Sequence, residues 1–182
     1  MQRRNLLTRV KAYANDHPEE RSVADRFVHL LETQPRCFER DCWAGHVTGS
    51  AWLLDPAYGS LLLTHHRKLD IWVQLGGHSD GDPDTAAVAV REAEEESGLQ
   101  VRLLDPAVFD LDIHEIPARK GDPVHFHYDV RFAMVAAGTH VTVSEESHAL
   151  RWVALSDLER FTTETSILRM RAKWLARADG LQ

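Results

Sequence analysis

The sequence predicts a mixed α/β domain preceded by a helical segment, and three observations support this class. Apolar residues recur at helical spacing along the first part of the chain, as far as Pro35, which ends a helix. Further along, β-rich runs alternate with turn residues. Residues 85–97 then combine helical periodicity with a face of small side chains suited to close packing on a sheet. We therefore expect a helical segment over residues 1–40 and the main domain over residues 41–182.

Two hairpins and two further strands make up the expected sheet. The second hairpin has a long tip over residues 117–121, and the run IWVQL is expected to end at Gly76 and Gly77. After the last strand, Ser156 to Glu159 fit a capping box, and residues 167–175 form a closing amphipathic helix. The expected strands cover residues 47–55, 60–66, 71–75, 108–116, 123–135 and 150–153.

Composition and charge narrow the class of protein. The net charge is −7, and no dense lysine or arginine tract marks a nucleic-acid or membrane surface. No run of about 18 apolar residues occurs, so we expect a cytoplasmic protein. Cys37 and Cys42 lack a second pair that would complete a zinc site, which favours reduced thiols. Eleven histidines are many for this length, but the number alone assigns no ligand.

The helix expected over residues 85–97 has clear signals at both ends. Asp84 or Thr85 can cap its N-terminus, and Gly98 can end it in the left-handed conformation. Three carboxylates, those of Glu92, Glu95 and Glu96, project together from one face of this helix, because they are spaced at i, i+3 and i+4.

This acidic face is unfavourable for folding alone. Like charges at this spacing cost a few tenths of a kcal/mol per pair, and the helix dipole disfavours negative charge near the C-terminal end. A divalent cation would explain the arrangement, because Mg²⁺ prefers oxygen ligands and is held by a few carboxylates together with substrate phosphates. The alternative is an ordinary solvated acidic face, since exposed glutamate is a good helix former.

Residues 77–99 resemble the Nudix box, a pattern of Gly, five residues, Glu, seven residues and then Arg-Glu-aliphatic-x-Glu-Glu-x-Gly-aliphatic. Pro83 stands where the pattern has its isolated Glu, with Asp82 and Asp84 on either side. The order of strands and helices extends the resemblance to about residues 44–160. The matching positions are Gly77, Arg91, Glu92, Ala93, Glu95, Glu96, Gly98 and Leu99.

The resemblance implies an α/β/α sandwich around a mixed sheet and hydrolysis of a diphosphate linkage. The implied substrate is a nucleoside diphosphate joined to another moiety, and the implied cofactor is Mg²⁺ or Mn²⁺. Arg91, Gly77 and Gly98 would support the box. The implied metal ligands are Glu92, Glu95, Glu96 and the carbonyl of Gly76. The implied general base is Glu92 or, from the loop before the last strand, Glu146, with Glu145 close by.

Contacts with substrate are expected from three further side chains: Arg67, ahead of Trp72, and His125 and His127. In the run HFHYDVRF, period-two alternation puts His125 and His127 on one face with Asp129 and Arg131, where cationic groups could hold phosphate. The alternative for this face is simple exposure to solvent. Likewise, Arg67 could belong to a polar turn.

Two other functions fit parts of the sequence. Isopentenyl-diphosphate isomerase has the same fold, but its motif carries Cys-Gly-His where this chain has Gly76-Gly77-His78. A non-catalytic Nudix-like module that binds a nucleotide as a sensor is favoured only by Pro83. For both the hydrolase and the sensor, the expected partner is a small nucleoside diphosphate derivative. The sequence does not decide between a monomer and a homodimer.

Overall fold

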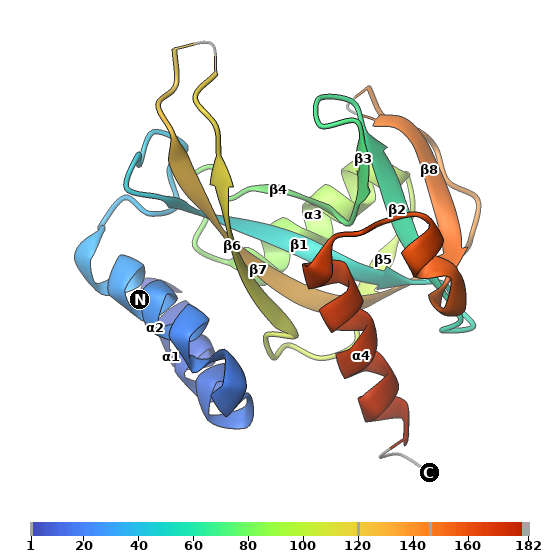
Figure 1. Ribbon diagram of the computed structural model, residues 1–182, viewed down its shortest axis with the longest axis horizontal. Helices are drawn as coiled ribbons and strands as arrows, with labels where there is room; N and C mark the ends of the chain where they lie inside the picture. The colour runs from blue at the N-terminus through green and yellow to red at the C-terminus, as the bar shows by residue number, and fades with distance from the viewer. Residues whose placement is uncertain (1, 120, 146, 180–182) are drawn as a thin grey trace. The chain divides into compact units, whose positions relative to one another are not determined.

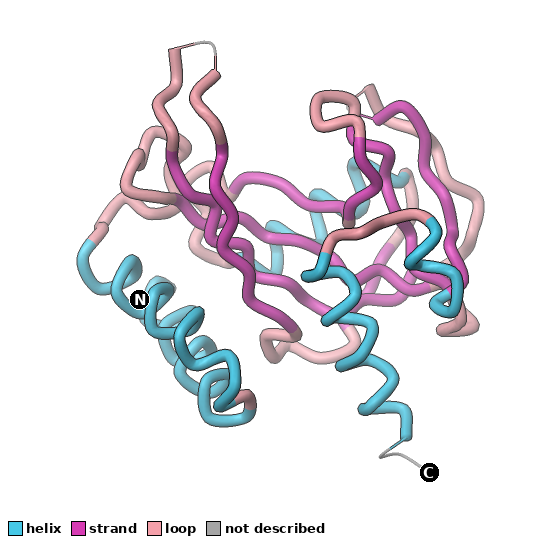
Figure 2. The backbone as a smooth tube through the Cα atoms, in the orientation of Figure 1, coloured by secondary structure: helices cyan, strands magenta, loops and turns pink. Residues whose placement is uncertain are grey.

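The computed structural model describes residues 2–119, 121–145 and 147–179 (Figure 1). These residues form two compact units, and strands β1 (His46–Leu54) and β7 (His125–Ala136) and helix α3 (Thr85–Ser97) run from one unit into the other. The first unit comprises the described residues up to Ser50, with Gly76–Ala89 and Asp105–Phe132; the second comprises Ala51–Leu75, Val90–Leu104 and the described residues from Ala133. The described residues contain both helices and strands, as expected for a mixed α/β protein (Figure 2).

In the first unit, the expected N-terminal helical segment is present as α1 (Gln2–Asp16), the 3-10 helix η1 (Pro18–Glu20) and α2 (Arg21–Thr33). Helices α1 and α2 lie side by side (Figure 1), and α2 also contacts β6 (Asp110–Ile116). The ring of Phe27, on the apolar face of α2, is fully buried and meets the ring of Tyr128 edge-on at 5.1 Å between centroids.

The second predicted hairpin is confirmed in the same unit. Strands β6 and β7 are antiparallel, with Asp110 opposite Arg131 and Ile116 opposite His125. The register therefore brings polar side chains of the two strands together along one face.

The expected strand over residues 71–75 is instead two short strands. Strand β3 (Ile71–Val73) pairs with β2 (Ser60–His66), whereas β4 (Leu75–His78) pairs with β1 and continues through the glycine pair. A Cβ on Gly76 would lie 2.2 Å from the Ser50 Oγ and 2.7 Å from the Gly49 carbonyl oxygen. The glycine thus extends the strand because it lets two backbones approach closely, rather than ending it.

The second unit contains the first predicted hairpin and the closing helix. Strand β2 pairs antiparallel with the end of β1, with β3 and with β8 (Ser147–Ala154). Strand β5 (Val101–Leu103) pairs with the second half of β7 and was not predicted, because three residues show no periodicity. Helix α4 is Thr165–Asp179.

The predicted capping box at Ser156 is wrong. Residues Leu155–Arg160 form a 3-10 helix, η2, which has no side-chain hydrogen bond at its N-terminus. This segment is held by tertiary contacts instead. Leu155 and Leu158 are buried, and the Leu155 amide donates a hydrogen bond to the Gly59 carbonyl oxygen. None of the helices in the described parts of the chain is long and apolar enough to cross a membrane.

Helix α3 has the predicted bounds and the predicted ends. The Asp84 carboxylate accepts a hydrogen bond from the Ala87 amide at 3.3 Å, as an N-terminal cap does. Gly98 ends the helix with a φ of 70°, and the Leu99 amide donates to the Ser97 Oγ at 3.2 Å. Both signals are local in sequence, which is why they could be located before the structure.

A glycine in β1 lets the first turns of α3 pack against the strand. A Cβ on Gly49 would lie 2.7 Å from the Thr85 carbonyl oxygen and 3.1 Å from the Ala89 amide nitrogen. We expect Gly49→Ala to lower the free energy of unfolding by about 2 kcal/mol, because backbone has to move to admit the methyl group. Gly138→Ala, where nothing lies within 4 Å, is the control. Equal melting temperatures for the two variants would contradict this packing.

Candidate functional site

The three glutamates predicted to bind metal lie on the second half of α3. Glu95 is exposed and Glu96 is partly buried. The Glu92 side chain is 20% exposed and accepts a hydrogen bond from the Arg91 guanidinium at 3.1 Å. The predicted box arginine therefore holds one of the carboxylates in place.

The role of these carboxylates as metal ligands stays a prediction. Within the described residues, groups of three ligand atoms lying within 4.8 Å of one another occur only at His46, His125 and His127 and at His17, Glu19 and Glu20.

The donor set nevertheless fits a hard divalent cation. Carboxylates at positions i, i+3 and i+4 of one helix supply the oxygen ligands that Mg²⁺ prefers. Gly76, the predicted carbonyl ligand, lies in the first unit, where its missing side chain keeps the backbone at this point tightly packed on Ser50. Pro83 lines a small hollow in the same unit beside Asn5, Leu6 and Arg9 of α1.

The predicted substrate contact Arg67 and the predicted alternative base Glu145 lie near the start of β8, in the second unit. The Arg67 guanidinium donates a hydrogen bond to the Ser147 carbonyl oxygen at 3.0 Å. The ring of Trp72 stacks on His65, with 5.0 Å between centroids and 15° between planes. Glu145 is exposed, and the predicted base Glu146 lies outside the described residues.

The polar face of β7 is buried, so its interpretation as a solvated sheet face is wrong. Asp129 and Arg131 are 1% and 2% exposed, and His125 is 7% exposed. The Arg131 guanidinium contacts three carboxylates: Asp129 at 2.7 Å, Asp110 at 3.1 Å and Asp112 at 3.3 Å. Burial by itself disfavours the charge, but these three neighbours raise the pKa of Arg131 above its ordinary value.

Further hydrogen bonds complete this buried network. The Asp129 carboxylate accepts from the Thr48 hydroxyl at 2.9 Å and from the Ser50 hydroxyl at 2.7 Å. Because Ser50 is also the residue against which Gly76 packs, the network braces the strand that carries the predicted carbonyl ligand. Because the Arg131 guanidinium is buried and contacts three carboxylates, we do not expect it to bind a substrate phosphate.

Next to the network, five imidazoles gather in the first unit. We call this group the histidine cluster: His46, His78, His114, His125 and His127. Centroid distances between neighbouring rings run from 4.7 Å for His46 and His127 to 5.4 Å for His125 and His127. Burial first, and the neighbouring imidazoles next, lower the pKa of His127 to about 2. Burial also dominates in lowering the pKa of His46 and of His78 to about 4.

The neutral state of His127 bears on its predicted contact with phosphate. A neutral imidazole can donate or accept one hydrogen bond but carries no charge to attract an anion. The roles of His125 and His127 in substrate binding stay predictions, and for His127 burial removes the charge on which the prediction rested.

Acid is expected to destabilise the protein between about pH 6.5 and pH 4, through His46, His78 and His127. A histidine whose pKa is lower in the folded chain takes up protons more readily when unfolded, so stability present above pH 6.5 is lost as pH falls toward the folded pKa. With EDTA present, we expect the melting temperature to drop by at least ~5 °C between about pH 7 and pH 5. The groups facing His46, His78 and His127 are Arg40, Asp80, His114 and His125.

The control for this prediction is a histidine outside the cluster. His127→Gln should reduce the drop in melting temperature, whereas His29→Gln, exposed on α2, should leave it unchanged. Parallel pH profiles for wild type and His127→Gln would contradict the assignment.

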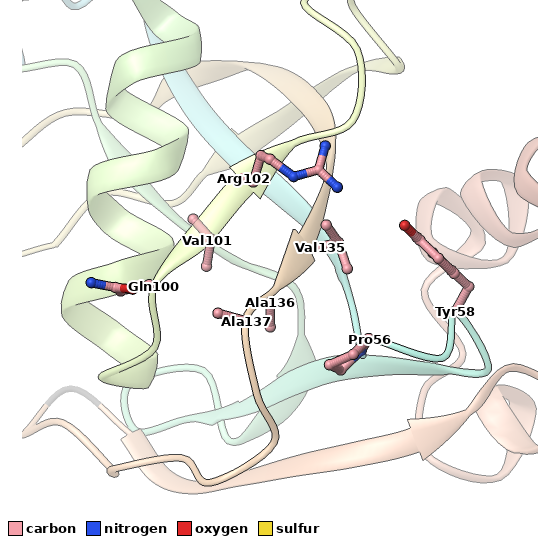
Figure 3. A pocket seen from close by; sticks show the side chains of 8 residues that line it. All are labelled: Pro56, Tyr58, Gln100, Val101, Arg102, Val135, Ala136 and Ala137. Atoms are coloured by element: carbon pink, nitrogen blue, oxygen red, sulfur yellow. The ribbon is translucent and has the colours of Figure 1, made fainter.

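The second unit contains a hollow of about 450 Å³ between the β1–β2 turn and strands β5 and β7. Figure 3 shows the residues around it, including Tyr58 and Arg102. None of the residues that line this hollow is among the predicted site residues.

Several polar residues that the structure brings together were not among the predicted site residues. Asp110, Asp112 and His114 alternate along β6 with period two, and this pattern could have marked a second polar face opposite β7. His46 and His78 carry no comparable signal, because each comes from a different strand and meets the others only through pairing.

Comparisons with known proteins agree with this architecture. The family profile described as NUDIX domain matches residues 45–174. No curated protein sequence matches the chain. Two solved structures share its fold at low identity. A Caenorhabditis elegans Ap4A hydrolase, solved as a binary complex, is 18% identical, with 74% of this chain and 98% of that chain covered and a TM-score of 0.60. A NUDIX-family hydrolase from Clostridium perfringens is 23% identical, with 70% and 95% covered and a TM-score of 0.55.

A third structure adds a ligand to the comparison. The NUDIX domain of Shewanella oneidensis NrtR, solved with ADP ribose, is 15% identical to this chain. The match covers 82% of this chain and 97% of that chain, with a TM-score of 0.54. The predicted class, a mixed α/β fold of this family with an N-terminal helical extension, is confirmed.

Proposed function

Because this chain belongs to the Nudix family, whose members hydrolyse diphosphate linkages, we propose that it cleaves a nucleoside diphosphate joined to another moiety, with the help of a divalent metal ion. The observation that carries the proposal is the box helix: Glu92, Glu95 and Glu96 follow Arg91 on a helix with the bounds and ends that the motif predicts. Two structures with this fold, an Ap4A hydrolase and a NUDIX domain solved with ADP ribose, are each associated with a nucleotide that contains this linkage.

Glu92, Glu95 and Glu96 would hold the cation. The Gly76 carbonyl stays the further ligand that the family resemblance implies. When bound, Mg²⁺ or Mn²⁺ neutralises charge on the phosphates and lowers the pKa of a coordinated water. The hydrogen bond from Arg91 orients the Glu92 carboxylate, which we propose either ligates the cation or takes the proton of the attacking water. Glu146 is the alternative proton acceptor.

Arg67 is the proposed cationic contact with the substrate phosphate. Its guanidinium already donates to the Ser147 carbonyl oxygen, which fixes one end and leaves further N–H groups to bind an anion. We do not include His125 and His127 in this contact, because His125 is buried and His127, whose pKa is lowered by burial, carries no charge to attract an anion.

A nucleotide sensor without hydrolytic activity is the second candidate, favoured by Pro83 at the position of the family glutamate. The two neighbouring aspartates already have other partners. The Asp82 carboxylate accepts a hydrogen bond from the Asp84 amide at 2.9 Å, and the Asp84 carboxylate caps α3. The intact glutamate pair on α3 favours the hydrolase.

A substrate panel separates these two functions. Nucleoside triphosphates, ADP-ribose, nucleotide sugars and dinucleoside polyphosphates are incubated with the protein and Mg²⁺ or Mn²⁺, with EDTA as the blank. We expect metal-dependent phosphate or nucleotide release from at least one compound. Binding of a nucleotide without turnover of any compound would instead support the sensor.

A further inference from the structure

The histidine cluster contains an unusual concentration of one side-chain type at the start of two strands. His46 begins β1, and His125 and His127 begin β7. One ligand nitrogen from each of these three residues lies within 4.8 Å of the other two. All three belong to the first unit.

Hydrogen bonding within the protein does not account for His46. This side chain is 2% exposed, and neither of its ring nitrogens has a hydrogen-bond partner among the described residues. An imidazole always carries at least one N–H donor, and a neutral one also has a lone pair, so burial without partners is costly. An apolar side chain of similar size would fill the space without this cost. Packing against the neighbouring rings therefore does not explain why this residue is a histidine.

The chemistry of the cluster matches a metal ligand set. A metal ion binds the lone pair of a ring nitrogen, and among the described residues neither ring nitrogen of the buried His46 has a hydrogen-bond partner. His125 shows the orienting contact typical of a metal ligand: its Nδ1 lies 2.9 Å from the Pro123 carbonyl oxygen, and as the donor there it leaves Nε2 as the acceptor.

We propose that His46, His125 and His127 bind a divalent transition-metal ion of the Zn²⁺ class. Three imidazole nitrogens are a common ligand set for Zn²⁺ and leave a fourth position open. The ring of His78 lies 5.2 Å from His46 and 4.9 Å from His127 between centroids, so His78 is the candidate for that position. Trp43, whose ring meets His125 edge-on at 5.4 Å, forms part of the surrounding wall.

This site differs in metal preference from the carboxylates of α3. Imidazole nitrogen suits Zn²⁺, whereas Mg²⁺ prefers oxygen and keeps several of its waters. Bound Zn²⁺ would join the first residues of β1 and β7, two strands that are far apart in sequence. The ion would thereby stabilise the folded first unit, and the site does not depend on whether the protein hydrolyses diphosphates.

The test measures metal content and stability, not hydrolysis. The protein, residues 1–182, is stripped with EDTA, dialysed against a small excess of Zn²⁺ in the presence of a large excess of Mg²⁺, and then freed of unbound metal. We expect one Zn²⁺ per wild-type chain and a rise in melting temperature of roughly 5–10 °C over the stripped protein. His46→Gln and His127→Gln should retain no Zn²⁺ above background.

Two control variants and one measurement on wild type keep the result clear. His29→Gln, on the exposed face of α2, and Glu95→Gln, on α3, should both bind Zn²⁺ as wild type does. X-ray absorption of the wild-type zinc complex should show imidazole ligands at about 2.0–2.1 Å, whether or not the histidine variants fold. The proposal is overturned if wild type retains no Zn²⁺, if Glu95→Gln loses it while His127→Gln keeps it, or if the ligands are all oxygen.

Discussion

Arg131→Met is expected to lower the free energy of unfolding by about 3–5 kcal/mol. The guanidinium is 2% exposed and contacts the carboxylates of Asp110, Asp112 and Asp129. Removing it leaves Asp110 and Asp129, both almost fully buried, without their positive partner. The penalty comes mainly from these uncompensated charges, because methionine replaces much of the lost volume.

Denaturant unfolding of wild type, Arg131→Met and Arg102→Met measures this effect. Arg102 is exposed on β5, and its only hydrogen bond to a described residue is the one it donates to the Leu103 carbonyl oxygen. Its replacement should therefore change stability by no more than ~0.5 kcal/mol. If Arg131→Met were as stable as Arg102→Met, the buried network would not be what holds β1, β6 and β7 together.

The same network shows where inference from sequence reached its limit. Period-two alternation correctly put Asp129 and Arg131 on one face of β7, because alternation is a local property of a strand. Whether that face is solvated depends on which strands pair with it. The partners Asp110 and Asp112 come from β6 and Thr48 from β1, and no local signal in β7 announces them.

Helix α3 illustrates the opposite case. Its cap at Asp84, its apolar face and its end at Gly98 are all set within about fifteen residues, so its bounds could be predicted correctly. The prediction that a strand ends at Gly76 was wrong for a tertiary reason, since that glycine is needed for close approach to Ser50. Glycine marks both strand ends and close contacts, and the sequence alone does not separate them.

Glu95→Gln is expected to lower the rate of diphosphate hydrolysis by ~100-fold or more. We propose Glu95 as a ligand of the divalent cation, and an amide in its place binds the cation weakly and carries no charge. Glu95 is exposed, so its replacement should leave the melting temperature unchanged. A loss of rate can then be attributed to the site and not to unfolding.

A neighbouring glutamate on the same helix provides the matched control. Glu94 accepts a hydrogen bond from the Val101 amide at 3.1 Å, and the amide oxygen of glutamine can accept the same bond. Glu94→Gln should therefore retain both its stability and its rate. The two variants differ by one position on α3 but present their side chains on different faces.

Initial rates of wild type, Glu95→Gln and Glu94→Gln, measured across a Mg²⁺ titration on a compound from the substrate panel, test the proposed function most directly. We predict a saturable Mg²⁺ dependence for wild type and Glu94→Gln, and a rate at least ~100-fold lower for Glu95→Gln at every concentration. Equal rates for wild type and Glu95→Gln, or a wild type that binds nucleotide but releases no product at any Mg²⁺ concentration, would contradict it.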